Sequence, residues 1–173
     1  MYNEGGTPEF RIMDWKRQIV DSFVACVAKT VGPIPYNNPT NEVETFLSTI
    51  WKMSMEAFDK PREVQVVVDH NNKLFINVGT PSFVSFDGAD EEDLEGMKIP
   101  FKCWIHTHPF GEAYFSRTDW DTINTWKPLL SNAIVLGDNE YWAYDVTREI
   151  VKQVKYGLLQ SPPVILEEIK EEE

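Results

Sequence analysis

Two of the three histidines in this chain lie one residue apart, in the segment WIHTHPFGEAYFSRTDWD (104–121). In an extended strand alternate side chains share a face, so His106 and His108 point the same way. Two imidazoles on one face can bind a single metal ion. Cys103 points to the opposite face by the same alternation. It is therefore expected in the core, and not as a Cys-x-x-His partner of His106.

A third ligand is available a short distance along the chain. Ser116 and Asp119 have the spacing of a helix N-cap and a first-turn acid. An ordinary capped helix explains this spacing, and it is compatible with a site because an acid at a helix start is held rigidly. His106, His108 and Asp119 would make a three-ligand zinc site with an open position for water. The residues therefore predict one zinc ion per chain.

The same residues resemble the signature of a known family. His106-Thr107-His108-Pro109, followed after seven residues from His108 by Ser116-x-x-Asp119, is similar to the JAMM (MPN+, JAB domain) metalloprotease motif. The aliphatic and Tyr-containing segments over 132–146 look like the strand pair that follows the motif in that family. The resemblance covers about residues 41–146. It implies an α/β fold of JAMM/MPN (cytidine-deaminase-like) architecture, with a single mixed β-sheet domain flanked by helices.

The family also uses an upstream glutamate as general base and acid. Glu63 matches it, because it follows Pro61 where a predicted helix gives way to a predicted strand. An exposed carboxylate at a strand start is the alternative interpretation. Glu44 and Glu56 are rivals, but they fall on helix faces. Val66 departs from the pattern, since the family commonly has Gly three residues after the glutamate.

The resemblance implies a role for each site residue. Zinc held by His106, His108 and Asp119 would activate a water. Glu63 would take the water's proton and hand it to the leaving amine, while Ser116 would donate a hydrogen bond to the oxyanion. The implied reaction is hydrolysis of a peptide or isopeptide bond in a protein substrate. The implied partner is a ubiquitin-like modifier, as in a deubiquitinase-like isopeptidase.

Two other functions share parts of this pattern. A non-catalytic MPN-type scaffold is one, although such proteins usually lose the metal ligands. A RadC-like DNA-associated protein is the other, because it shares the histidine spacing and has a glycine at the position of Gly111. The formal net charge of −12 argues against a broad basic face for nucleic acid. No nucleic-acid partner is therefore expected.

The elements that must position these residues follow from hydrophobic spacing. Apolar residues at helical intervals predict one helix over Ile12–Val31 and a second that starts near Asn41 and stops by Lys60. Asn41 and Glu44 are spaced like a capping box for the second helix. The period then changes, and 63–79 reads as a β-hairpin with His70 in the turn.

The rest of the chain reads mainly as strands. Residues 117–126 predict a helix, and 148–160 fit either a helix or a strand. Further strands are expected over 82–86, 101–108, 132–137 and 140–146. The order predicts a mixed α/β domain with a central sheet flanked by helices.

Three parts are expected along the chain. Residues 1–40 hold an N-terminal helix and a Pro-rich connector, 41–160 the catalytic domain, and 161–173 an acidic tail, whose end over 167–173 is expected to fray. The first helix is either a packing element or a dimerisation helix. The acidic segment 87–96 is either a solvated loop or a guide for a basic partner.

Cysteine usage and the lack of targeting signals suggest a compartment. Cys26 and Cys103 lie in apolar runs far apart, which favours buried free thiols. No signal peptide or membrane span is apparent, so a cytoplasmic protein without a membrane partner is expected. Aromatic residues could line a substrate groove, but their spacing is more typical of core: Trp120, Trp126, Tyr141, Trp142 and Tyr144.

Overall fold

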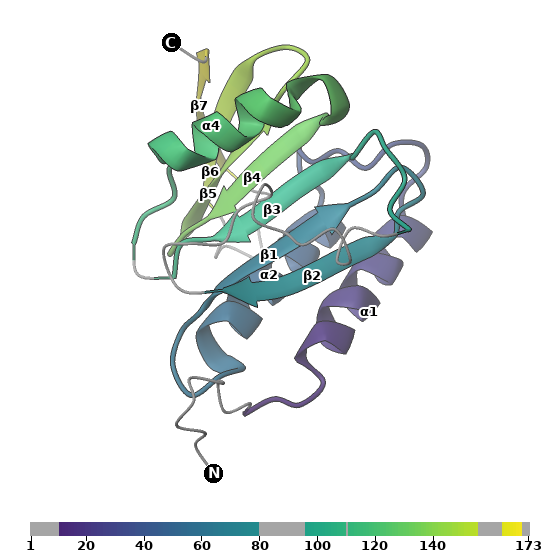
Figure 1. The fold of residues 1–173 in the computed structure, drawn as a ribbon, viewed down its shortest axis with the longest axis vertical. Helices are drawn as coiled ribbons and strands as arrows, with labels where there is room; N and C mark the ends of the chain where they lie inside the picture. Colours follow the sequence, from purple (N-terminus) through teal and green to yellow (C-terminus); the bar gives the residue numbers. More distant parts are fainter. Residues whose placement is uncertain (1–10, 80–95, 110, 156–163, 171–173) are drawn as a thin grey trace.

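The fold is an α/β arrangement built on one mixed sheet, as expected (Figure 1). A computed structural model describes residues 11–79, 96–109, 111–155 and 164–170. The strands are β1 Glu63–Val68, β2 Leu74–Gly79, β3 Cys103–Thr107, β4 Asn132–Leu136, β5 Glu140–Asp145, β6 Ile150–Lys155 and β7 Val164–Lys170. The helices among the described residues are α1 Trp15–Ala28, α2 Asn41–Glu56 and α4 Arg117–Trp126, with a short 3-10 turn η1 at Lys127–Leu129.

The seven-stranded sheet has the order β2-β1-β3-β4-β5-β6-β7. Only β3 and β4 run parallel, and α4 makes the crossover between them. The other neighbouring strands are antiparallel. The β3–α4–β4 unit matters for the site because it returns the chain over one face of the sheet directly after the histidines.

Helices α1 and α2 cover one face of the sheet (Figure 1). Ile19 and Phe23 of α1 join Phe46 of α2 and Ile105 of β3 in one hydrophobic cluster. The rings of Phe23 and Phe46 lie 4.9 Å apart, centroid to centroid. The first helix is therefore a packing element of the same core, which the sequence left open.

Helix α4 covers the opposite face, around a second cluster. Ile123 of α4 packs there with Trp104 of β3 and Tyr144 of β5. Tyr141 and Tyr144 are fully buried, and Trp120, Trp126 and Trp142 pack against the second cluster. These aromatic residues are thus core, and not the lining of a groove.

Most predicted elements are confirmed, with one correction at a helix start. The capping box expected at Asn41 and Glu44 is wrong: Thr40 is the N-cap, with an extended backbone and a side chain that accepts from the Val43 N–H at 3.3 Å. Helix α2 ends at Glu56, and so stops before Lys60 as expected.

The C-terminal part also differs from expectation. Of the segment 148–160, which fitted either helix or strand, residues 150–155 form β6. The frayed end expected over 167–173 is wrong for residues 167–170, because residues 164–170 form β7 and pair with β6. Residues of β7 are ordered because their backbone N–H and C=O groups pair with those of β6, which would otherwise be unpaired at the edge of the sheet. The strand expected over 82–86 lies outside the described residues.

Candidate metal centre

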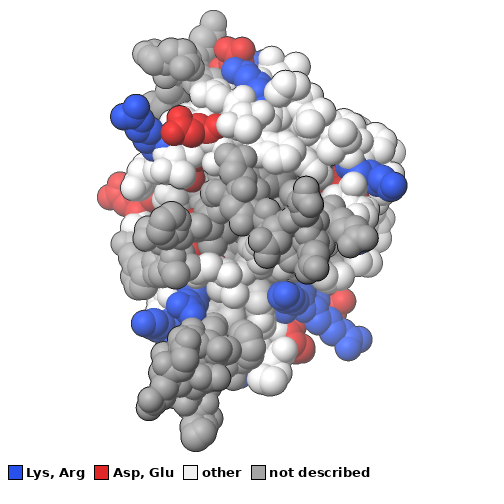
Figure 2. Space-filling model, viewed as in Figure 1, with Lys and Arg blue, Asp and Glu red and all other residues white. Residues whose placement is uncertain are grey.

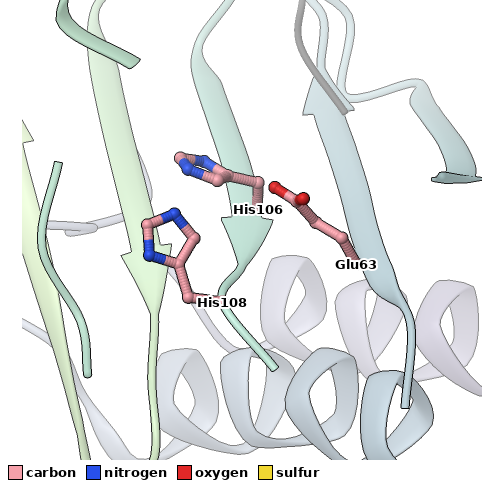
Figure 3. A group of neighbouring side chains, drawn as sticks. All are labelled: Glu63, His106 and His108. Atoms are coloured by element: carbon pink, nitrogen blue, oxygen red, sulfur yellow. The ribbon is translucent and has the colours of Figure 1, made fainter. Parts of the chain in front are cut away.

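The candidate site lies where β1 and β3 run side by side. Gln65 pairs with His106 in antiparallel register, and the same register continued by two residues sets Glu63 opposite His108. Residues opposite one another share a face of the sheet. Glu63, His106 and His108 therefore project to the face that α4 covers (Figure 3).

The two histidines differ in access to solvent. The side chain of His106 is fully buried, whereas that of His108 is 15% exposed. His108 lies just past the end of β3, and its backbone N–H donates to Leu136 O at 2.8 Å, which fixes the residue against β4. One imidazole thus lies inside the protein and the other faces the opening of the site.

Glu63, His106 and His108 form a group that could bind a metal ion. One ligand atom from each lies within 4.8 Å of the others, and Glu63 is only 3% exposed. The three residues come from β1 and from the end of β3, so strand pairing alone brings them together (Figure 3).

Asp119 lies beside the two histidines, in the first turn of α4. Its Oδ2 lies 3.1 Å from His106 Nε2 and 3.3 Å from His108 Nε2. The expected Ser116–Asp119 capping box is confirmed: Ser116 N–H donates to Asp119 Oδ2 at 2.9 Å, and Asp119 N–H donates to Ser116 Oγ at 3.1 Å. The ordinary helix cap is what holds the carboxylate beside both imidazoles.

The carboxylate of Asp119 is held in its ionised form. Burial by itself would raise the pKa of this group. The charge that His106 can carry, the contacts with both imidazoles and the Ser116 N–H outweigh burial, and the pKa of Asp119 falls well below its usual value. An ionised, 5% exposed carboxylate is the form that binds a metal ion.

The geometry of these contacts suits a shared metal better than hydrogen bonding. His106 Nε2 is buried and makes no hydrogen bond, although Asp119 Oδ2 is only 3.1 Å away. The ring nitrogen therefore does not aim at that oxygen. In a tetrahedral zinc site with bonds of about 2.0–2.1 Å, neighbouring ligand atoms lie about 3.3 Å apart. The two contacts of Asp119 Oδ2 have this length.

Polar contacts on the other side of β3 fix the strand that bears the histidines. Thr107 Oγ1 accepts from Val64 N–H at 2.9 Å and lies 3.0 Å from Ser54 Oγ. Ser54 Oγ in turn donates to Arg62 O at 2.5 Å. This chain ties the end of α2 to both strands, and so to the start of β1 where Glu63 lies.

A second set of contacts lies on the same face as the histidines. Trp104 Nε1 donates to Gln65 Oε1 at 2.8 Å, and the Trp104 ring stacks on His106 with centroids 4.5 Å apart. The Tyr114 ring meets His108 edge-on at 5.0 Å and is 49% exposed. Neither Gln65 nor Tyr114 belongs to the motif that marks the site in the sequence. The alternation of β1 would have revealed Gln65.

Gly137 was also missed, and it sets the position of the loop between the histidines and α4. A Cβ on Gly137 would lie 2.3 Å from Ala113 N and 2.8 Å from Glu112 C. Only a residue without a side chain lets the loop pack this closely on the end of β4. In the sequence, the signal that could have revealed Gly137 is its position between an aliphatic strand and a turn.

The remaining candidates lie outside this group. Glu56 is exposed on the last turn of α2, and His70 is exposed in the hairpin turn, as expected. Glu44 is buried in the first turn of α2 and takes no part in the group of ligands. Cys26 and Cys103 are buried free thiols, as predicted.

Comparisons with known proteins add no relative. No family model, curated protein or solved structure matches the chain.

In the part that the structure describes, no helix has the length and apolar character needed to cross a membrane. On the face seen in Figure 2, Lys and Arg side chains form separate groups toward the edges of the molecule.

Proposed function

We propose that this protein is a zinc-dependent metallopeptidase of the JAMM/MPN type, which hydrolyses peptide or isopeptide bonds of a ubiquitin-like protein conjugate or precursor. The observation that carries the proposal is the position of Asp119 Oδ2, at 3.1 and 3.3 Å from the Nε2 atoms of His106 and His108. The motif resemblance rests on sequence, and this convergence is independent support for it.

The residues fit zinc by their chemistry as well as by distance. Two imidazole nitrogens and one carboxylate oxygen are a common ligand set for catalytic zinc. His106, His108 and Asp119 would hold the ion. Zinc in such a site supplies Lewis acidity, which acidifies water and polarises a substrate carbonyl.

Glu63 is suited to proton transfer. It forms a group of potential ligand atoms with His106 and His108, all within 4.8 Å of one another, and its carboxylate is nearly shielded from solvent. A carboxylate beside the reacting water can accept a proton and return it to the leaving amine. We assign Glu63 this role because three other residues already supply a complete ligand set.

Ser116 is suited to hydrogen bonding with the substrate. Its Oγ accepts from Asp119 N–H, a bond that uses a lone pair and not the hydroxyl proton. The hydroxyl can therefore still donate to an oxygen that becomes negative during hydrolysis. The half-buried position of Ser116 at the start of α4 keeps this group next to Asp119.

The arrangement favours an enzyme over a non-catalytic scaffold. A structural zinc site is closed by four protein ligands, usually with cysteine among them. The two cysteines of this chain are buried free thiols, and Cys103 packs in the cluster on the α1–α2 face. A site of two histidines and one aspartate, with His108 partly open to solvent, leaves room for substrate.

Metal content and hydrolysis test the proposal together. Wild-type protein should bind about one zinc per chain and cleave conjugates of a ubiquitin-like protein, and a chelator should abolish cleavage. His106→Ala should lose the zinc. Glu63→Gln should keep the zinc and lose hydrolysis by about two to four orders of magnitude.

Glu56→Gln is the matched control, because Glu56 is an exposed glutamate at the end of the neighbouring helix. It should retain both zinc and activity. Full zinc content in His106→Ala would disprove the ligand assignment. An active Glu63→Gln protein would move the role of base to another carboxylate.

A further inference from the structure

A groove lies at the end of the sheet where β3 and β4 end, on the side of α2. Its volume is about 680 Å³, and Pro109, the residue after His108, forms part of its wall. Trp51 and Met55, both half-buried on α2, form an apolar side. The lining of the groove thus includes the residue that directly follows a proposed zinc ligand in the chain.

The charged residues of the groove are mostly acidic. Among the described residues that line it, Glu112, Asp138 and Glu140 are acidic and Lys155 is the one cation. Glu112 and Asp138 are exposed, and Glu140 is half-buried. Three carboxylates near one apolar wall give a negative potential that attracts a cationic ligand. The net charge of −12 on the whole chain acts in the same direction at longer range.

The cation of the groove has an acidic residue across from it. Lys155 lies directly opposite Glu140 in the register of strands β5 and β6. Opposite charges at directly opposed positions attract each other. Lys155 therefore offsets Glu140 and leaves Glu112 and Asp138 to face an incoming ligand.

The apolar wall adds a second element of recognition. The aliphatic stem of an arginine or lysine side chain packs on apolar surface while its charged end stays in water. An indole ring also attracts a guanidinium group. Trp51 and Met55 on one side and carboxylates on the other therefore match an arginine-bearing peptide better than an apolar or acidic one.

We propose that this groove binds a basic, arginine-bearing segment of the polypeptide substrate. The proposal rests on the proposed function for the identity of the bond that is cut. The binding itself needs no hydrolysis. In this proposal the groove determines which substrate binds, and His106, His108 and Asp119 hold the metal.

Binding of model peptides to the full chain tests this. The probe is a short arginine–glycine repeat peptide, with a glutamate–glycine peptide of the same length as its comparison, and the signal is tryptophan fluorescence or calorimetry. Glu63→Gln protein is used, so that no cleavage disturbs the equilibrium. The arginine peptide should bind, with affinity falling as salt is raised, and the glutamate peptide should not.

Variants on the groove should change the affinity in opposite directions. Glu112→Gln and Asp138→Asn should each weaken binding of the arginine peptide about twofold to fivefold, the range for exposed charge pairs. Lys155→Gln should tighten it by a similar factor, because it releases Glu140. Asp21→Asn is the control: Asp21 is an exposed acid on α1, in an ion pair with Arg17, and its loss should leave binding unchanged.

Equal binding of both peptides, or equal effects of Asp138→Asn and Asp21→Asn, would overturn the proposal. Weaker binding by Lys155→Gln would overturn it as well. Failure of the groove proposal can be distinguished from failure of the proposed function. A protein that binds zinc and cleaves conjugates but ignores the arginine peptide refutes the groove alone. One that binds the peptide but holds no zinc refutes the metallopeptidase alone.

Discussion

Gly137→Ala should disturb the site from a distance, through the loop that carries the chain from the histidines to α4. The added Cβ would lie 2.3 Å from Ala113 N and 2.8 Å from Ala113 Cα. Both are backbone atoms, so no side-chain rotation can relieve the contact. The φ of Gly137 is outside the left-handed region, and the cost therefore comes from this contact and not from the backbone conformation of alanine.

The magnitude follows from overpacking. Insertion of a methyl group into a filled site costs about 1–3 kcal/mol. For a chain of this size each kcal/mol lowers Tm by about 2–4 °C, so Tm should fall by about 2–12 °C. The loop can relax only by moving away from β4, and that motion shifts Ser116 and Asp119. Zinc affinity should therefore fall by about tenfold or more, as for lost support of a metal ligand.

The assay pairs thermal unfolding with zinc titration. Gly111→Ala is the matched control, because Gly111 lies in the same loop, has no atom within 4 Å of an added Cβ and has no left-handed φ. It should leave both Tm and zinc affinity near wild type. If Gly137→Ala and Gly111→Ala behave alike in both measurements, the close packing of this loop on β4 is refuted.

Three further changes test the packing around the site. Glu44→Met should stabilise the protein by about 1–3 kcal/mol at neutral pH in denaturant unfolding, because both carboxylate oxygens of Glu44 are buried without a partner. Burial raises the pKa of Glu44, so the wild-type protein loses stability as pH rises through that ionisation, and the advantage of Glu44→Met should disappear in acid. Thr107→Val should destabilise by about 1–3 kcal/mol, since Val64 N–H and Ser54 Oγ lose a buried partner, whereas Thr107→Ser should restore most of that loss. Ser116→Ala should cost about 0.5–2 kcal/mol through the lost cap, and equal stability of this variant and wild type would contradict the capping box.

Local patterns in the sequence were enough to predict most elements. Alternation over 63–79 predicted the hairpin, and the spacing of Ser116 and Asp119 predicted the cap of α4. Both depend on interactions between residues close in the chain, which leave a readable period. The same logic predicted that His106 and His108 share a face.

Contacts between distant segments needed the tertiary structure. Glu63 reaches the histidines because β1 lies next to β3 in the sheet. No local pattern in the sequence shows that these two strands are neighbours. The prediction that the chain frays from residue 167 was wrong for 167–170 for the same reason, because the partner strand β6 was itself ambiguous in the sequence. Gly137 acquires its importance only from a loop that folds back onto β4.

The sequence by itself determined which side chains can bind metal, because ligand chemistry and strand alternation are local properties. The tertiary structure decided that they meet. Strand pairing sets Glu63 beside His108, and the crossover through α4 returns Asp119 to within 3.1 and 3.3 Å of the two imidazoles. Such convergence depends on the packing of whole elements around two cores, and spacing along the chain does not encode it directly.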